Sequence, residues 1–189
     1  MLRYLLVAFV LLLALYTMVA YNGLVSKEEK VEQTWGNVQD RYQRRLDLTP
    51  NLVSVVKGMA DFEQETLVQI TEARSNALAR AGGEVTAKNY SEQGRVQDTL
   101  AAASNRLIAV IEKYPVLRGT EAFRGLQTQL EGNERRIKVA RSDFNAAVRD
   151  YNQAVRSFPR NIVAGIFGFD VKEGFAADAG AENNVEIKF

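Results

Sequence analysis

The sequence of 189 residues contains no cysteine and no histidine. The absence of cysteine excludes disulfide bonds and thiolate catalysis, although it does not assign a cellular compartment. The absence of histidine removes the commonest general base and the commonest zinc ligand. Enzyme classes and metal sites that depend on either residue are therefore excluded at the outset.

The net charge is also small, and proline is rare. The 24 basic and 23 acidic residues leave a formal charge of +1, which gives no electrostatic case for binding nucleic acid. The three prolines, Pro50, Pro115 and Pro159, are few enough to mark helix boundaries in an α-helical protein. A hydrophobic fraction of 47% with 25% charged residues is typical of a folded chain.

The most distinctive segment is the uncharged run YLLVAFVLLLALYTMVAY at residues 4–21. At 1.5 Å per residue this run spans about 27 Å as a helix, and extension to Val25 gives about 33 Å. That length crosses a hydrocarbon core of roughly 30 Å, and tyrosines near both ends suit the interface. Residues 1–25 are therefore predicted to form a single-pass transmembrane anchor.

A cleaved signal peptide is the alternative for this segment. Its apolar region usually covers about 7–15 residues and ends in a small-x-small site. The run here is longer, and the best candidate site, Met18-Val19-Ala20, has a large residue at the first small position. We therefore expect the anchor to be retained.

Two features give opposite indications of membrane orientation. Lys27, Lys30 and Arg41 follow the anchor and favour a cytoplasmic C-terminal part, because positive residues mark the inner side. The very short basic head before the anchor instead favours export of the long C-terminal part. On balance we expect the long C-terminal part to be exported across the membrane.

After the anchor, apolar residues recur at steps of three and four, as on one face of a helix. The second helix is predicted to begin at Thr49-Pro50, as N-cap and first helical residue, and to end before Gly82-Gly83. Ser91 and Thr120 are candidate caps for the third and fourth helices, and Pro115 ends the third. The predicted helices cover residues 24–46, 50–81, 91–114 and 121–158.

The fourth predicted helix carries a strict heptad repeat. Its large row is Phe123, Leu130, Ile137, Phe144, Tyr151 and Phe158, and its second row is Leu126, Asn133, Ala140, Ala147 and Ala154. A repeat of seven indicates coiled-coil-like packing against a partner helix. The small residues also suggest a second interface, so candidate partner or oligomer contacts are Ala140, Ala147, Ala154, Val148 and Val155.

The expected fold is all-α: an N-terminal transmembrane helix followed by a long antiparallel four-helix bundle over residues 26–158. In this order the fourth helix returns towards the membrane, followed by a tail, 159–189, that is first apolar and then flexible. Five large apolar residues are candidates for membrane or subunit contact: Ile162, Val163, Ile166, Phe167 and Phe169. The alternative is that this segment folds over the end of its own bundle.

Charged clusters offer little evidence for catalysis. The densest cluster is Glu131, Glu134, Arg135, Arg136, Lys138 and Arg141, where acids and bases lie four residues apart as in ordinary helix-surface ion pairs. Arg44, Arg45, Asp47 and Pro50 are interpreted as a structural turn, with an anion or lipid-headgroup site as the alternative. We predict no catalytic residues, no metal site and no cofactor.

Several motifs together resemble the LemA family across nearly the whole chain. They are Tyr21-Asn22-x-Leu24-Val25, Trp35-x-x-Val38, Arg44-Arg45-x-Asp47-Leu48-x-Pro50-Asn51-Leu52-Val53, Tyr114-Pro115, Leu126-Gln127-x-Gln129-Leu130-Glu131-Gly132-x-Glu134-x-Arg136-Ile137, Ala140-Arg141 and Phe158-Pro159-x-Asn161. Asn133 departs from the Thr or similar small residue expected there. The resemblance implies a bacterial, membrane-anchored helical protein with no settled biochemical activity. With it, we expect the anchor to lie in the inner membrane and the exported C-terminal domain in the periplasm. One branch of the family is associated with magnetosome membrane formation, and other members with envelope metallopeptidases of the HtpX type.

Two non-enzymatic functions fit these features. The first is a membrane-anchored scaffold that self-associates and organises or shapes the bacterial membrane, with the bilayer and further copies of the chain as partners. The alternative is an adaptor that binds an envelope metallopeptidase. Neither function involves nucleic acid or a cofactor.

Overall fold

The structure, a computed structural model, describes residues 1–57, 63–82 and 87–175. Its regular elements in this part of the chain are all helices. They are α1 (Leu2–Lys57), α2 (Gln64–Ala79), α3 (Ala87–Ile111), α4 (Pro115–Arg118), α5 (Glu121–Arg156) and α6 (Arg160–Phe167). The N-terminal apolar helix and the all-α class expected from the sequence are both confirmed.

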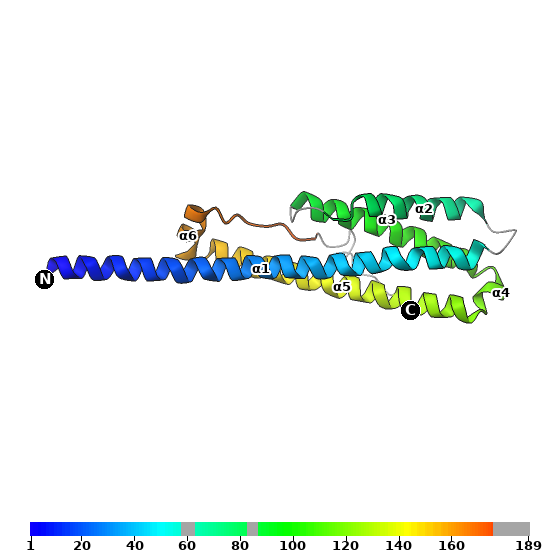
Figure 1. Cartoon of the computed structure of the whole chain (residues 1–189), viewed down its shortest axis with the longest axis horizontal. Coiled ribbons are helices and arrows are strands. Elements are labelled where there is room, and N and C mark those ends of the chain that lie inside the picture. Colours follow the sequence, from blue (N-terminus) through cyan, green and yellow to red (C-terminus); the bar gives the residue numbers. More distant parts are fainter. Residues whose placement is uncertain (58–62, 83–86, 176–189) are drawn as a thin grey trace, which may run out of the picture.

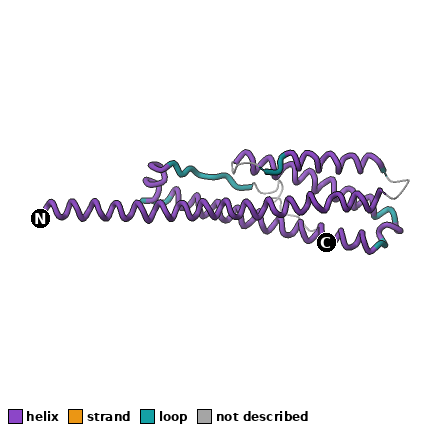
Figure 2. The backbone as a smooth tube through the Cα atoms, in the orientation of Figure 1, coloured by secondary structure: helices purple, strands orange, loops and turns teal. Residues whose placement is uncertain are grey.

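The helices form an elongated molecule built around α1 (Figure 1). The N-terminal part of α1 projects beyond the other helices, and its remainder packs mainly against α5. Arg45 meets Glu134 and Trp35 meets Phe144, so α5 runs back along α1 towards the anchor. Figure 2 shows α2 and α3 lying side by side as a second pair, beside the α1–α5 pair.

The single helix α1 corrects the prediction of separate helices over residues 24–46 and 50–81. Its 56 residues run through Thr49 and Pro50, so the predicted turn at Arg44, Arg45, Asp47 and Pro50 does not form. Proline lacks a backbone N–H and normally leaves the carbonyl four residues earlier without a partner. Here Arg74 of α2 donates its Nε–H to that carbonyl, at Leu46, over 3.1 Å. The helix continues because a neighbouring helix replaces the missing donor.

Of the predicted helix caps, Thr120 is confirmed and Ser91 is wrong. Thr120 caps α5 as predicted, since its hydroxyl accepts a hydrogen bond from the Phe123 N–H at 3.3 Å. Ser91 is not a cap, because α3 already begins at Ala87. Gly82 follows α2 with a φ of +89°, a backbone conformation that favours glycine, whereas Gly83 lies outside the described residues.

Among the residues that the structure describes, the buried apolar side chains form two separate cores. The core nearer the anchor contains Trp35, Phe144 and Tyr151, and the distal core contains Ile70 and Phe123. All members of the predicted heptad row from Phe123 to Tyr151 are buried, which confirms that row as core. Phe158 is 81% exposed, so the row ends one heptad earlier than the sequence predicted.

After α5 the chain forms the short helix α6 and then an extended segment. Gly168 ends α6 with a φ of +76°, and residues 169–175 run back along α5 (Figure 1). Val163 and Ala164 are buried in the core nearer the anchor. The Tyr21 ring lies 4.9 Å from the Phe167 ring, between centroids, which places α6 beside the emerging anchor.

We predict that Arg74→Leu lowers the free energy of unfolding by about 1–3 kcal/mol, because the Leu46 carbonyl loses its donor while remaining buried. In a Pro50→Ala background the same change should cost much less, since residue 50 then supplies a backbone N–H to that carbonyl. Urea unfolding of the full chain in detergent measures both. Equal losses in the two backgrounds would contradict this explanation of α1.

Candidate functional site

Arg45 is the most deeply buried charged residue in the described part of the chain, with 2% exposure. Its Nε and Nη2 groups donate to the two carboxylate oxygens of Glu134 on α5, at 2.8 and 2.5 Å. Its Nη1 group donates to the Gln97 backbone carbonyl at 2.7 Å and to the Gln97 side chain at 3.1 Å. One guanidinium therefore ties α1 to both α3 and α5.

A second cation lies one turn closer to the anchor. Arg141 of α5 donates to the Tyr42 hydroxyl at 2.9 Å and to Asp98 of α3 at 2.7 Å. Burial raises the pKa of the Tyr42 phenol above its ordinary value, although Arg141 partly offsets that effect. Tyr42 therefore stays a neutral acceptor in this contact at physiological pH.

Asn133 completes the set, with 1% exposure and its Nδ2 donating to the Arg41 carbonyl at 3.2 Å. We call the following residues the polar layer: Tyr42, Arg45, Gln97, Asp98, Asn133, Glu134 and Arg141. The two apolar cores lie on either side of it along the molecule. Buried hydrogen-bonding groups between two apolar cores favour one register of α5 against α1, since any shift would leave them unpaired.

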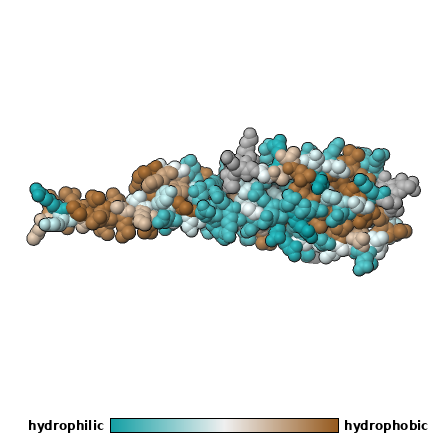
Figure 3. All heavy atoms as spheres, in the orientation of Figure 1, coloured by the Kyte–Doolittle hydropathy of each residue, from teal (hydrophilic) through white to brown (hydrophobic). Residues whose placement is uncertain are grey.

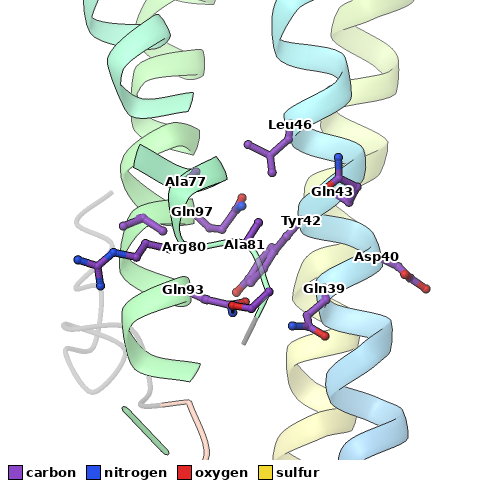
Figure 4. A pocket seen from close by; sticks show the side chains of 12 residues that line it. Gln39, Asp40, Tyr42, Gln43, Leu46, Ala77, Arg80, Ala81, Gln93 and Gln97 are labelled. Carbon is purple, nitrogen blue, oxygen red and sulfur yellow. Dashed lines mark hydrogen bonds between the residues drawn. The ribbon is translucent and has the colours of Figure 1, made fainter. Parts of the chain in front are cut away.

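A cleft of about 250 Å³ opens beside the polar layer, between α1 and the α2–α3 pair. Tyr42 of α1 and Gln93 and Gln97 of α3 face this cleft (Figure 4), whereas Asp40 and Arg80 at its rim point away. Glutamine side chains and one phenol thus dominate its polar surface. Such a cleft offers hydrogen-bond donors and acceptors, without a paired acid and base.

The described residues contain no group of three or more acidic side chains placed to hold a metal ion. The charged side chains in the polar layer are engaged in ion pairs or hydrogen bonds with one another. This arrangement connects α1, α3 and α5 through hydrogen bonds and ion pairs. It also leaves a polar cleft open beside them.

The structure places the candidate site residues in different environments, some buried and some exposed. Ala140, Ala147, Ala154, Val148 and Val155 are all buried in the core nearer the anchor, so they pack within the chain rather than offering a surface to a second copy. Among the tail candidates, Val163 is buried and Phe169 is partly buried, whereas Ile162, Ile166 and Phe167 are exposed. The cluster at 131–141 is not purely a surface cluster, because Glu134 and Arg141 enter the polar layer.

Sequence reasoning missed the Arg45–Glu134 pair, whose members lie 89 residues apart in the chain. One feature could have suggested it. Arg45 lies three residues after Tyr42 and four before Thr49, on the same helical stripe as apolar positions. A charged residue on such a stripe needs a buried partner.

The N-terminal part of α1 is long and apolar enough to cross a membrane, and only 6% of its most hydropathic 18-residue window is buried. The leucines and valines of this part are largely exposed, and the face of it that Figure 3 shows is mostly brown. A core helix of a soluble protein would be mostly buried instead. The chain thus has the features of a membrane-associated helical protein.

The family assignment follows from comparison with known proteins. The sequence model of the LemA family matches residues 34–189, and the chain belongs to the LemA family. The match begins beyond the apolar segment and covers the polar layer, α6 and the extended segment.

Relatives include two proteins named for magnetosomes. The chain is 28% identical to magnetosome protein MamQ 2 of Paramagnetospirillum magneticum and to magnetosome protein MamQ of Magnetospirillum gryphiswaldense, over 82% of this chain and 64% of each relative. It is 23% identical to protein LemA of Metamycoplasma hominis, over 76% of this chain and 63% of that protein. The chain therefore spans less than two thirds of the length of these relatives.

We predict that Glu134→Ala lowers the free energy of unfolding by about 2–3 kcal/mol, because Arg45 stays buried without its counter-ion. The loss is smaller than for a fully buried pair, since the Glu134 side chain is 41% exposed. The matched control is Glu131→Ala on the exposed surface of the same helix, which should change stability by less than about 0.5 kcal/mol. Urea unfolding in detergent compares them, and equal effects would show that the Arg45 contact contributes little.

Proposed function

We propose that this protein is a non-enzymatic, membrane-anchored scaffold that self-associates and organises or shapes the bacterial membrane. Residues 1–25 lie in the inner membrane in this proposal, and the helical segments that follow act on the periplasmic side as one antiparallel four-helix bundle. The continuous helix α1 supports this proposal, because a helix without a break transmits the position and tilt of the anchor to the bundle.

The observation that carries the proposal is the apolar surface where α1 emerges from its apolar segment. Helix α6 lies there, with Val163 and Ala164 turned into the bundle and Ile162, Ile166 and Phe167 turned outwards. Ile166 is 71% exposed and Phe167 is 51% exposed. Figure 3 shows the brown surface of the anchor continuing onto this region. A short amphipathic helix beside a membrane anchor favours shallow insertion between lipid headgroups.

A lateral groove of about 500 Å³ adds to this surface. It is formed by the anchor and Phe167, and its anchor residues are Val10, Leu13, Ala14, Thr17, Met18 and Tyr21. Its walls are almost wholly apolar, which suits a lipid acyl chain. A helix that inserts beside such a groove displaces headgroups in one leaflet only, and this asymmetry favours curvature of the bilayer.

Two relatives are named magnetosome proteins, and a role in organising a membrane is consistent with those names. The adaptor for an envelope metallopeptidase is a second candidate function. The glutamine-lined cleft is the observation that favours it, because amide side chains can hold the main chain of a bound partner. No comparable feature of the cleft favours the metallopeptidase over other proteins, so the scaffold is our preferred function.

We expect the detergent-extracted full chain to form a uniform assembly larger than a monomer. The elongated shape and the exposed surface of α6 leave large areas for contact between copies. Light scattering coupled to size-exclusion chromatography in mild detergent measures the protein mass. A monomer at every concentration, especially one that co-purifies with a peptidase, would favour the adaptor instead.

We also expect the full chain, reconstituted at high density, to convert large vesicles into narrower or smaller ones. Ile166→Asp combined with Phe167→Asp should leave the anchor inserted but greatly reduce this remodelling, because charged side chains at α6 oppose insertion among lipid chains. The matched control is Val139→Asp, at an exposed site on α5 farther from the anchor. Electron microscopy of the vesicles provides the readout, and equal remodelling by both variants would contradict the role of α6.

A further inference from the structure

The extended segment 169–175, which we call the strap, is held by two asparagines of α5. Asn152 donates its Nδ2–H to the Lys172 carbonyl at 2.7 Å and accepts from the Lys172 N–H at 2.8 Å. Asn145, seven residues earlier, makes the same pair of bonds with Phe175, at 3.2 and 2.8 Å. Each amide thus pairs with the main chain of one strap residue, as a neighbouring strand does in a β-sheet.

Two side chains of the strap also occupy fitted sites. The Phe175 ring lies 5.5 Å from the Phe144 ring and 5.9 Å from the Trp35 ring, and the Arg141 guanidinium lies 5.0 Å from its centroid. The Lys172 ammonium lies 2.8 Å from a carboxylate oxygen of Glu28 on α1. Gly174 lies between Lys172 and Phe175, and a Cβ atom at this position would approach the Asn145 Oδ1 to 2.6 Å.

These contacts together describe a recognition groove for an extended polypeptide. The asparagine pair binds main-chain atoms, which any extended segment offers, and recognition of peptides by added strands uses the same chemistry. Glu28 and the aromatic cluster then select a basic residue, and an aromatic residue three positions later. The close approach at Asn145 selects glycine just before the aromatic residue. Lys172, Gly174 and Phe175 meet all three requirements.

We propose that this groove is a site for the strap of a second copy, which exchanges with the chain's own strap when copies assemble. The inference rests on the proposed self-association and names the contact that produces it. The groove is complementary to this sequence, so another copy supplies the best-fitting partner. Exchange of an identical element is a common route from monomer to oligomer.

Three features make this exchange feasible. Asp170, Val171, Glu173 and Gly174 are exposed, so release of the strap withdraws only the partly buried Phe169, Lys172 and Phe175 from their contacts. From Gly168 to Phe175 the extended chain reaches roughly 23–25 Å, which is the reach of a released strap towards a neighbouring copy. The continuous helix α1 also holds the groove of every copy at the same height above the membrane, so a released strap meets a neighbouring groove without vertical displacement.

The contact between Glu28 and Lys172 allows a direct test with native residues. A water-soluble carbodiimide joins an amine and a carboxylate in contact as an amide. Two forms of the full chain are co-expressed in one membrane, one of them marked by Glu29→Asp and Val171→Ile, which are conservative changes at exposed positions. Mass spectrometry then distinguishes amides within one form from hybrid amides between the two. Free exchange between equal amounts should make roughly half of the Glu28–Lys172 amides hybrid.

The control changes the groove of the unmarked form only. Asn145→Leu with Asn152→Leu should remove the hybrid amides that join Glu28 of the unmarked form to Lys172 of the marked form. Gln153→Leu, at an exposed site on the same helix, should leave these amides unchanged. Amides found only within one form, in a sample that light scattering shows to be oligomeric, would overturn strap exchange while leaving self-association intact. Hybrid amides that survive the double asparagine change would also overturn it, because they would then reflect mere proximity of copies.

Discussion

Helix α1 is one unbroken helix, and α2, α5 and α6 pack along its length. Pro50 removes a backbone donor in mid-helix, and Arg74 of α2 supplies another to the Leu46 carbonyl. Since the helix does not end there, Leu52 and Val56 of the distal core lie on the same rod as the apolar segment and Arg45. Helix α5 follows this rod back towards the anchor, and α6 consequently arrives beside Tyr21, where the chain's exposed apolar groups gather.

The polar layer fixes how the other helices meet this rod. Arg45 is buried with four hydrogen bonds to two helices, which is an arrangement that apolar residues of similar volume often replace without loss of stability. Its value lies instead in specificity, because a coiled-coil-like seam can slip by one heptad at modest cost. With Arg45 paired to Glu134, slippage would leave a buried charge. The register that results also aligns Asn145 and Asn152 with the strap and Glu28 with Lys172.

Local sequence patterns predicted the helical class, the N-terminal apolar helix, the Thr120 cap and the buried row from Phe123 to Tyr151, because these features depend on nearby residues only. The features that failed depend on contacts between distant segments. Pro50 breaks a helix by local rules, and no local pattern shows that Arg74 will compensate. Glu134 and Arg141 look like members of surface pairs until α1 and α3 supply Arg45, Tyr42 and Asp98. The asparagines that bind the strap likewise have no local signature, since their partners lie 20 and 30 residues later.

In the proposed function, anchor and bundle move as one rigid unit through α1. The absence of native cysteine makes paired spin labels straightforward, and Val10→Cys with Asp40→Cys places labels at exposed sites on either side of the point where the anchor ends. Thirty residues of uninterrupted helix separate these positions by about 45 Å. Pulsed electron–electron double resonance on the full chain in lipid bilayers should therefore give one narrow distribution of label-to-label distances, centred at about 45 Å. A broad distribution extending to much shorter distances would show a hinge between anchor and bundle and would contradict the account.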